Sequence, residues 1–232
     1  QMTGIGGDCF VLFSPAGRND ILAMNGSGKS PAGVTAQMLQ ELGHETVPIR
    51  DVHAVTVPGA IDAFCQLSTD WGKLGIDRVL APAIAYAESG VPVAPRVAED
   101  WGGLMNDLHE TAMPYFSMSG RAPKIGERHA HPQLAKVLKK IAKDGRDGFY
   151  KGDVADDMVT TLQSLGGTHT LDDFANQTAF YTAPIQGTYQ DVDLVEHPPN
   201  GQGATAILMG NILKNFDLSS MDPFGADRTH IE

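Results

Sequence analysis

The sequence has only two cysteines, few aromatic residues and a small share of basic residues. Cys9 and Cys65 are far apart, and no histidine cluster accompanies them at metal-ligand spacing, so they indicate no metal centre. Cys9 lies in an apolar stretch, where a buried, unreactive thiol is more typical than a nucleophile. The 17 basic residues against 28 acidic ones give a net charge of −11. This balance argues against nucleic acid as a partner, because phosphate binding requires a basic face.

Long apolar runs are also absent. No stretch of about 18 apolar residues occurs, so the sequence predicts no membrane-spanning segment. The net charge, spread over single acidic residues, favours a soluble protein. The chain does not begin with Met, and we expect a larger protein whose true N-terminus lies upstream. The compartment therefore stays open between periplasmic or extracellular and cytoplasmic. The basic stretch from Lys136 to Lys143 is expected on the solvated face of an amphipathic helix.

Apolar periodicity and turn residues predict one α+β domain over residues 1–232, with a helix-rich middle from Pro58 to Thr178. Thr170 is the expected N-cap of a short helix, because an acidic residue follows three positions later. Strands are predicted at 10–13, 21–24, 185–188 and 192–195, the first two forming a hairpin. Further helices are predicted within 34–42, 59–67, 76–90, 134–141, 154–165 and 206–213.

The segment Ala23–Ser30 matches a relaxed phosphate-binding loop between a strand and a helix. Pro31 removes one N–H group from the helix start, and no later strand ends in a good second ligand for magnesium. A nucleotide-binding module therefore remains only as an alternative. No Gly-x-Ser-x-Gly elbow is present, and no residue is marked by spacing as a base for Ser27, which favours an ordinary turn serine.

The histidines and paired acids indicate little chemistry. His129 and His131 could form a metal pair, but Pro132 and an amphipathic helix follow at once, which favours a solvated loop leading into that helix. The acidic pairs Asp156-Asp157 and Asp172-Asp173 are expected at the surface or as helix caps. The residues by themselves predict no metal site, no cofactor and no self-sufficient catalytic set.

Several segments, taken in order, resemble the γ-glutamyltransferase family. They are Gly4-Ile5-Gly6-Gly7-Asp8, Lys29-Ser30-Pro31, Val57-Pro58-Gly59, Phe149-Tyr150-Lys151-Gly152, Gly166-Gly167 with Leu171-Asp172-Asp173, Pro198-Pro199-Asn200-Gly201-Gln202-Gly203, and Asn211-Ile212-Leu213 with Phe216-Asp217. Each segment is weak alone, but their order and spacing span nearly the whole chain. The first of them is then expected to supply packing and turn glycines at the start of a central strand.

This resemblance implies part of a four-layer αββα sandwich, the fold of N-terminal nucleophile hydrolases. In the family a precursor cleaves itself into a large and a small subunit, and the new N-terminal threonine of the small subunit is both nucleophile and base. It takes the acyl group from a γ-glutamyl amide and passes it to water or to an amino acid. The chain resembles a large-subunit portion, so we expect the small subunit as its partner and no catalytic residue before Glu232.

The family's large subunit contacts the substrate α-carboxylate through an arginine, and here the sequence departs from the pattern. The matching position holds Ser27, and Ser27-Gly28 replaces the family's Arg-Glu pair, so the bidentate contact is missing. We predict that Lys29, with Ser27, contacts a substrate carboxylate; a solvated loop lysine is the alternative. The departure also leaves open an acylase or amidohydrolase with a non-glutamyl donor, or a non-catalytic scaffold subunit.

Overall fold

A computed structural model describes residues 4–220, so the ends of the predicted domain, 1–3 and 221–232, lie outside the described residues. The strands are β1 (Cys9–Phe13), β2 (Leu22–Gly26), β3 (Val91–Pro92), β4 (Arg128–His129), β5 (Phe180–Thr182), β6 (Ile185–Tyr189) and β7 (Val192–Glu196). The α-helices are α1 (Ala36–Glu41), α2 (Ala60–Asp70), α3 (Ile76–Ser89), α4 (Pro95–Leu104), α5 (Met113–Phe116), α6 (Pro132–Asp144), α7 (Asp147–Tyr150), α8 (Asp153–Ser164), α9 (Leu171–Ala175) and α10 (Gly203–Leu213). Short 3-10 turns occur at Val52–Ala54, Met105–Asp107 and Leu218–Ser220.

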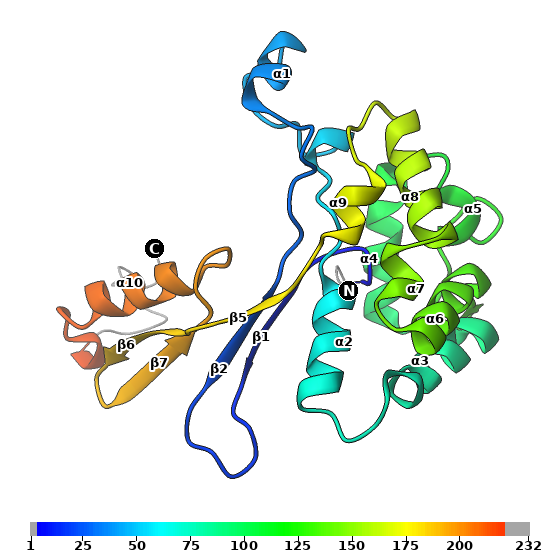
Figure 1. The fold of residues 1–232 in the computed structure, drawn as a ribbon. Coiled ribbons are helices and arrows are strands. Elements are labelled where there is room, and N and C mark those ends of the chain that lie inside the picture. Colours follow the sequence, from blue (N-terminus) through cyan, green and yellow to red (C-terminus); the bar gives the residue numbers. More distant parts are fainter. Residues whose placement is uncertain (1–3, 221–232) are drawn as a thin grey trace.

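A three-stranded antiparallel sheet in the order β1-β2-β5 forms the centre of the molecule (Figure 1). Helix α2 covers one face, where Met24 packs with Ala63 and Ala179. Because side chains alternate along a strand, Phe10 and Phe180, which both pair with Asn25, face the other side. These two rings are 39% and 52% exposed although Asn25 between them is buried, so the described residues leave the outer strands of that face partly uncovered.

The helices α2 to α9 gather on one side of this sheet (Figure 1), and α2, α3 and α6 to α9 share one core. Its largest fully buried side chains include Ile61 from α2, Ile141 from α6, Tyr150 from α7 and Phe174 from α9. Helices α3 and α6 lie against each other, and α3 runs as one helix with Pro82 inside it. The expected helix-rich middle is therefore confirmed.

Most predicted elements are present, and several short or weakly patterned elements are additional, among them β3, β4, α5 and α7. The hairpin of β1 and β2, the strands β6 and β7, and the capping box of Thr170 with Asp173 match the predictions, and β6 and β7 also pair as a hairpin. Helix α4 was not predicted, because few apolar residues and two adjacent glycines, Gly102-Gly103, weaken its pattern. Strand β5 was also not predicted, since three residues carry too little periodicity.

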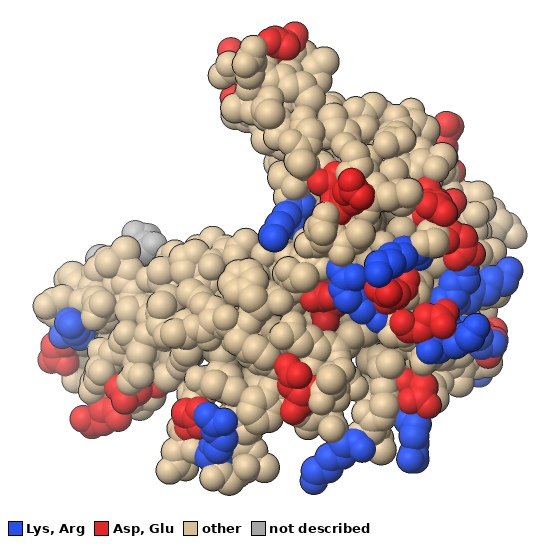
Figure 2. Space-filling view, in the orientation of Figure 1, with Lys and Arg blue, Asp and Glu red and all other residues tan. Residues whose placement is uncertain are grey.

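Two parts project from the central sheet. The segment after β2 rises as an arm that carries α1, and the β6-β7 hairpin with α10 forms a lobe on the other side of the sheet from the helical core (Figure 1). The space-filling view is hollowed between the arm and this lobe (Figure 2). Over residues 4–220, no helix has the length and apolar character needed to cross a membrane.

Candidate functional site

The candidate site is the loop that leaves β2 and contains Ser27 and Lys29. It begins where the arm rises from the sheet, at the base of the hollow (Figures 1 and 2). Ser27 is half-buried and Lys29 is exposed. Across residues 4–220 no acidic side chain forms a salt bridge with Lys29 (the salt bridges found involve other cations), so its ammonium group is available to an anion.

The backbone N–H groups of the loop already have partners. The N–H of Ser27 donates to Asn25 Oδ1 at 2.9 Å, that of Gly28 to Asp8 Oδ1 at 3.1 Å, and that of Lys29 to Gln177 Oε1 at 3.3 Å. A phosphate-binding loop needs these N–H groups free to donate to the phosphate. A carboxylate beside them, such as that of Asp8, would repel the phosphate. Helix α1 also begins only at Ala36, well beyond Ser30. The geometry thus gives the nucleotide-binding alternative no support.

The hydroxyl of Ser27 belongs to an asparagine-rich corner. Asn200 donates to Ser27 Oγ at 3.3 Å, and Asn25 donates to Asn200 Oδ1 at 2.9 Å. No histidine or carboxylate forms a hydrogen bond with this hydroxyl among the described residues, so nothing here activates it as a nucleophile. Ser27 can instead offer its proton to a ligand oxygen.

Backbone packing explains why position 28 has no side chain. A Cβ on Gly28 would lie 1.7 Å from the carbonyl oxygen of Val57, and one on Gly59 would lie 2.3 Å from that of Gly26. The same approach lets the N–H of Val57 donate to the carbonyl of Lys29 at 2.9 Å. In this loop conformation the Arg-Glu pair of the resembled family has no room for its second member.

The glycine-rich segment Gly4–Gly7 contacts the start of α2, next to the loop after β2. The carbonyl of Gly7 accepts from the N–H groups of Gly59 and Ala60 at 3.1 and 3.0 Å, which caps the start of α2. The turn expected there is present, since the N–H of Gly7 donates to Gly4. Among residues 4–220 no atom lies within 4 Å of a Cβ on Gly4 or Gly6, so packing against the described residues does not require glycine at those two positions.

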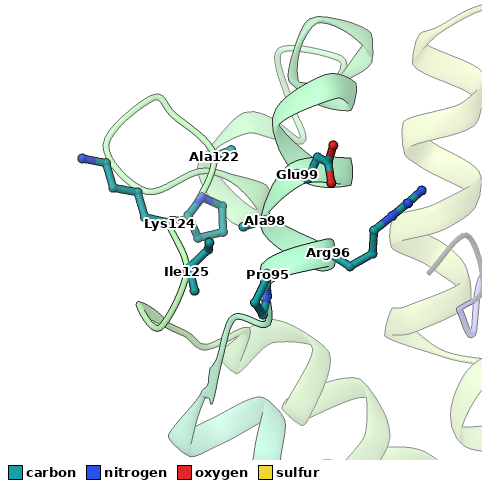
Figure 3. Close-up of a pocket in the computed structure, with 8 residues that line it drawn as sticks. Pro95, Arg96, Ala98, Glu99, Ala122, Lys124 and Ile125 are labelled. Carbon is teal, nitrogen blue, oxygen red and sulfur yellow. The ribbon is translucent and has the colours of Figure 1, made fainter.

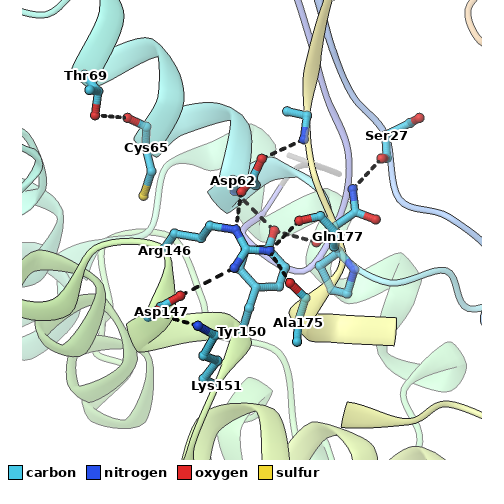
Figure 4. A network of polar contacts seen from close by, with 12 residues as sticks. Ser27, Asp62, Cys65, Thr69, Arg146, Asp147, Tyr150, Lys151, Ala175 and Gln177 are labelled. Carbon is cyan, nitrogen blue, oxygen red and sulfur yellow. Dashed lines mark hydrogen bonds and ion pairs between the residues drawn. The ribbon is translucent and has the colours of Figure 1, made fainter. Parts of the chain in front are cut away.

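A polar network that includes Gln177, Arg146 and Asp62 supports the loop after β2 (Figure 4). Gln177 is 1% exposed and donates to the carbonyl of Ser27 at 3.0 Å while accepting from Lys29. The carbonyl of Gln177 accepts from Arg146 at 2.5 Å, and Arg146 forms a salt bridge with Asp62 at 2.5 Å. Asp62 also accepts from the N–H of Ala179 at 2.6 Å. Every member of this chain of contacts has a partner, which fixes the loop rather than offering a reactive group.

Burial makes the nearby ionisable groups unreactive. It raises the pKa of Cys65 to about 11, with the negative charge of Asp62 adding to the effect, and it raises the pKa of Cys9. Burial also raises the pKa of Tyr150, whose hydroxyl donates to the carbonyl of Pro58 at 2.7 Å. Both thiols therefore stay protonated at neutral pH, as expected for unreactive cysteines.

One prediction about the histidines is wrong. His129 and His131 are half-buried rather than solvated, because His129 lies edge-on to Trp101 with ring centroids 4.8 Å apart and His131 stacks on Tyr115. Burial lowers the pKa of both histidines. His131 also caps α6 by accepting from the N–H of Leu134 at 3.1 Å. The acidic pairs behave as expected: Asp156 and Asp157 are exposed.

A separate pocket lies between α4 and the segment 122–125 (Figure 3). Its volume is about 760 Å³, and its walls include Pro95, Ala98 and Ile125. Three charged residues, Arg96, Glu99 and Lys124, line it, and the side chains of Arg96 and Lys124 extend away from each other (Figure 3). No set of polar groups converges there, so the pocket is a poorer candidate site than the loop after β2.

Sequence reasoning did not identify the residues that position the loop. Asn25, Gln177 and Asn200 contact it from three separate parts of the chain. Asp173 was expected only as a cap, and it also accepts from the N–H of Ala32 at 3.0 Å. The motif around Pro198-Pro199-Asn200 was visible in the sequence, but the contact partner of Asn200 was not.

Comparisons with known proteins agree with this geometry. The chain is 35% identical over its whole length to the glutathione hydrolase-like YwrD proenzyme of Bacillus subtilis and spans 44% of that relative. Its fold matches the Helicobacter pylori gamma-glutamyltranspeptidase structure with a TM-score of 0.87 at 26% identity, covering 98% of this chain and 67% of that one. It also matches cephalosporin acylase from Bacillus halodurans with a TM-score of 0.85 at 35% identity, covering 92% and 41%.

The chain thus spans less than half of the curated relative, and it shares the fold of N-terminal nucleophile hydrolases. The matched proteins include hydrolases and transferases, so the family is one of enzymes. The family model described as Gamma-glutamyltranspeptidase matches residues 1–232. The chain therefore belongs to the gamma-glutamyltranspeptidase family.

Proposed function

We propose that this chain is the large-subunit portion of an enzyme that transfers or hydrolyses a γ-glutamyl or related acyl amide. The nucleophile is a threonine supplied by a small subunit from the same precursor, and residues 1–232 contribute substrate binding and scaffold. The relatives are named as proenzymes, which is consistent with a precursor that is processed into two subunits.

The observation that carries the proposal is the exposed ammonium group of Lys29, which forms no salt bridge within residues 4–220 and stands on a fixed backbone. Its N–H and carbonyl are held by Gln177 and Val57, so the start of the side chain is positioned even though its end is solvated. Ser27, two residues away, keeps a hydroxyl proton for a second contact. A lysine and a serine on one short loop suit a substrate carboxylate, as a point charge with one added hydrogen bond.

The uncovered apolar surfaces fit the proposed partner. Phe10, Leu12 and Phe180 are exposed on the sheet face opposite α2. Leu208 and Met209 of α10 are also more than half exposed. We propose that the small subunit covers the sheet face with its own sheet, which completes the four-layer sandwich that the resemblance implies.

A non-glutamyl acyl donor is the second candidate, and Gly28 favours it. The loop has no room for the residue that accompanies the family's arginine, so the bidentate carboxylate contact is replaced by a single lysine. One solved relative is named as a cephalosporin acylase, which shows that the fold accommodates other donors. Under this alternative the substrate carboxylate is differently placed or absent.

The test is the variant Lys29→Ala in the full-length protein. Loss of a charge-assisted contact worth about 1.5 kcal/mol should raise KM for a carboxylate-bearing amide about tenfold, with kcat little changed. Lys29→Arg should restore much of the affinity. The matched control is Lys136→Ala, because Lys136 is also exposed and lies on α6, away from the hollow.

The outcomes separate the candidates. Equal KM values for wild type and Lys29→Ala with every donor would contradict the role of Lys29. A raised KM for amides with an α-carboxylate, and not for matched amides without one, would favour the γ-glutamyl donor over the alternative. Titration with magnesium and ATP should show no binding, and saturable binding there would revive the nucleotide alternative.

A further inference from the structure

Three side chains outside the candidate site come together at the arm. His44 follows α1, and Asp51 and His53 flank the start of the 3-10 turn Val52–Ala54. One ligand atom from each of the three lies within 4.8 Å of the others. All three residues are half-buried, and the His53 side chain is only 10% exposed.

Local backbone structure holds both halves of this cluster. The N–H of Gly43 donates to Gln40 and that of His44 to Leu39, both at 2.9 Å, while Gly43 has a φ of 85°. This is the Schellman arrangement, which fixes His44 just beyond the helix. On the other side, Asp51 Oδ1 accepts from the N–H of His53 at 2.9 Å.

The side chains of the cluster are already oriented toward one another. Asp51 Oδ1 lies 2.5 Å from His53 Nδ1, and the rings of His44 and His53 have centroids 6.4 Å apart. The neighbouring cation Arg50 is engaged elsewhere, since it forms a two-pronged salt bridge with Asp107. A cation entering the cluster would therefore meet one carboxylate whose charge Arg50 does not neutralise.

Two imidazoles and one carboxylate are a ligand set with definite preferences. Zinc and similar divalent transition metals bind imidazole nitrogen together with carboxylate oxygen. Magnesium and calcium prefer oxygen ligands alone, so they fit poorly. Three protein ligands also leave a position that water can occupy in a tetrahedral site.

We propose that His44, Asp51 and His53 bind one zinc ion, which joins the arm carrying α1 to the 3-10 turn at its base. The arm needs such a link, because Leu39 is the only buried residue of α1. The site is separate from the Ser27 and Lys29 loop, and the proposal does not depend on the acyl donor. Its role is to hold one wall of the hollow in place.

Zinc titration of the full-length protein, freed of metal by a chelator, tests the site. Isothermal titration with zinc chloride should show a binding event that His44→Ala and His53→Ala each weaken at least about 100-fold, the upper end of what loss of a supporting residue costs. His109→Ala is the matched control, because His109 contacts only Thr111 among the described side chains, and it should bind like wild type. Equal zinc affinity in wild type and both variants would overturn the proposal.

Hydrogen exchange tests the link between arm and turn. Zinc should slow amide exchange in residues 36–50 of the wild-type protein and have no such effect in His53→Ala. Circular dichroism of each variant checks folding, and Asp51→Asn provides a third variant if either histidine variant unfolds. Zinc bound at the three residues without slower exchange in the arm would overturn the linking role.

Discussion

Two cations lie close to Gln177, and they differ in almost every respect. Arg146 sits beneath the loop with its guanidinium paired to Asp62 and to the carbonyls of Ala175 and Gln177. Lys29 sits on the loop itself, exposed and without a salt bridge in the part of the chain that the structure describes. A charge whose partners are all supplied by the protein stabilises the fold, whereas a charge left without one is available to a substrate.

The comparison also separates perturbed groups from functional ones. Strongly shifted pKa values often mark active sites, yet here burial raises the pKa of Tyr150 and Cys65 within the satisfied network. Tyr150 donates to Pro58 and accepts from the N–H of Asp62 at 3.1 Å. These contacts join α2 to α7, so the perturbation reports packing and not catalysis.

The largest expected effect comes from removing Arg146, the half-buried partner of the buried Asp62. Arg146→Ala leaves Asp62, whose side chain is 8% exposed, with an unpaired charge. Loss of one partner of a fully buried pair costs about 3 to 5 kcal/mol, and because Arg146 is 25% exposed we expect the lower end, about 3 kcal/mol, in the free energy of unfolding measured with urea on the full-length protein. Arg146→Lys should recover part of this, and Lys29→Ala should leave the urea midpoint unchanged. Comparable stability losses from Arg146→Ala and Lys29→Ala would remove the distinction between the two cations.

The next effect concerns the backbone contact that shapes the loop. In Gly28→Ala the new Cβ meets the carbonyl of Val57, which cannot move without displacing the chain before α2. We expect a loss of about 3 kcal/mol in the free energy of unfolding, the upper end for overpacking, together with a lower kcat/KM.

The matched control for this variant is Gly102→Ala. No described residue lies within 4 Å of a Cβ at Gly102 in α4, and alanine favours a helix over glycine by up to about 1 kcal/mol. Gly102→Ala should therefore be neutral or stabilising. A Gly28→Ala protein that matches it in urea unfolding and in activity would show that the loop does not need the close approach to Val57.

The smallest expected effect concerns the exposed ion pair of Arg121 and Glu127, which contrasts with the pair of Arg146 and Asp62. Hydrogen bonds from Arg121 and from the N–H of Lys124 lower the pKa of Glu127 from 4.5 to about 2 in the folded protein. A lowered pKa stabilises the fold above pH 4.5, and this contribution is lost as the pH falls through about 2. Glu127→Gln should flatten this acid limb, measured as the urea midpoint from pH 5 down to about 2. High salt should also weaken the effect, because the pair is exposed.

The sequence predicted the helices and strands with strong periodicity and missed those without it. Helix α6 follows from a repeating apolar face that buries Leu138 and Ile141, whereas α4 contains two glycines and buries none of its residues. Ser27 and Lys29 were predicted as ligand contacts because motif spacing located their loop. That role remains a prediction, since the described contacts establish their exposure and support but include no substrate.

The sequence by itself determined the family, the helix-rich middle and the position of the loop, because ordered motifs and apolar periodicity are local properties of a chain. Only the tertiary structure decided which charges are satisfied. Arg146 and Asp62 are 84 positions apart, and Asn200 lies 173 positions from Ser27. Contacts over such separations depend on how the sheet, α2 and the lobe of β6, β7 and α10 pack together. Local sequence patterns therefore do not predict them.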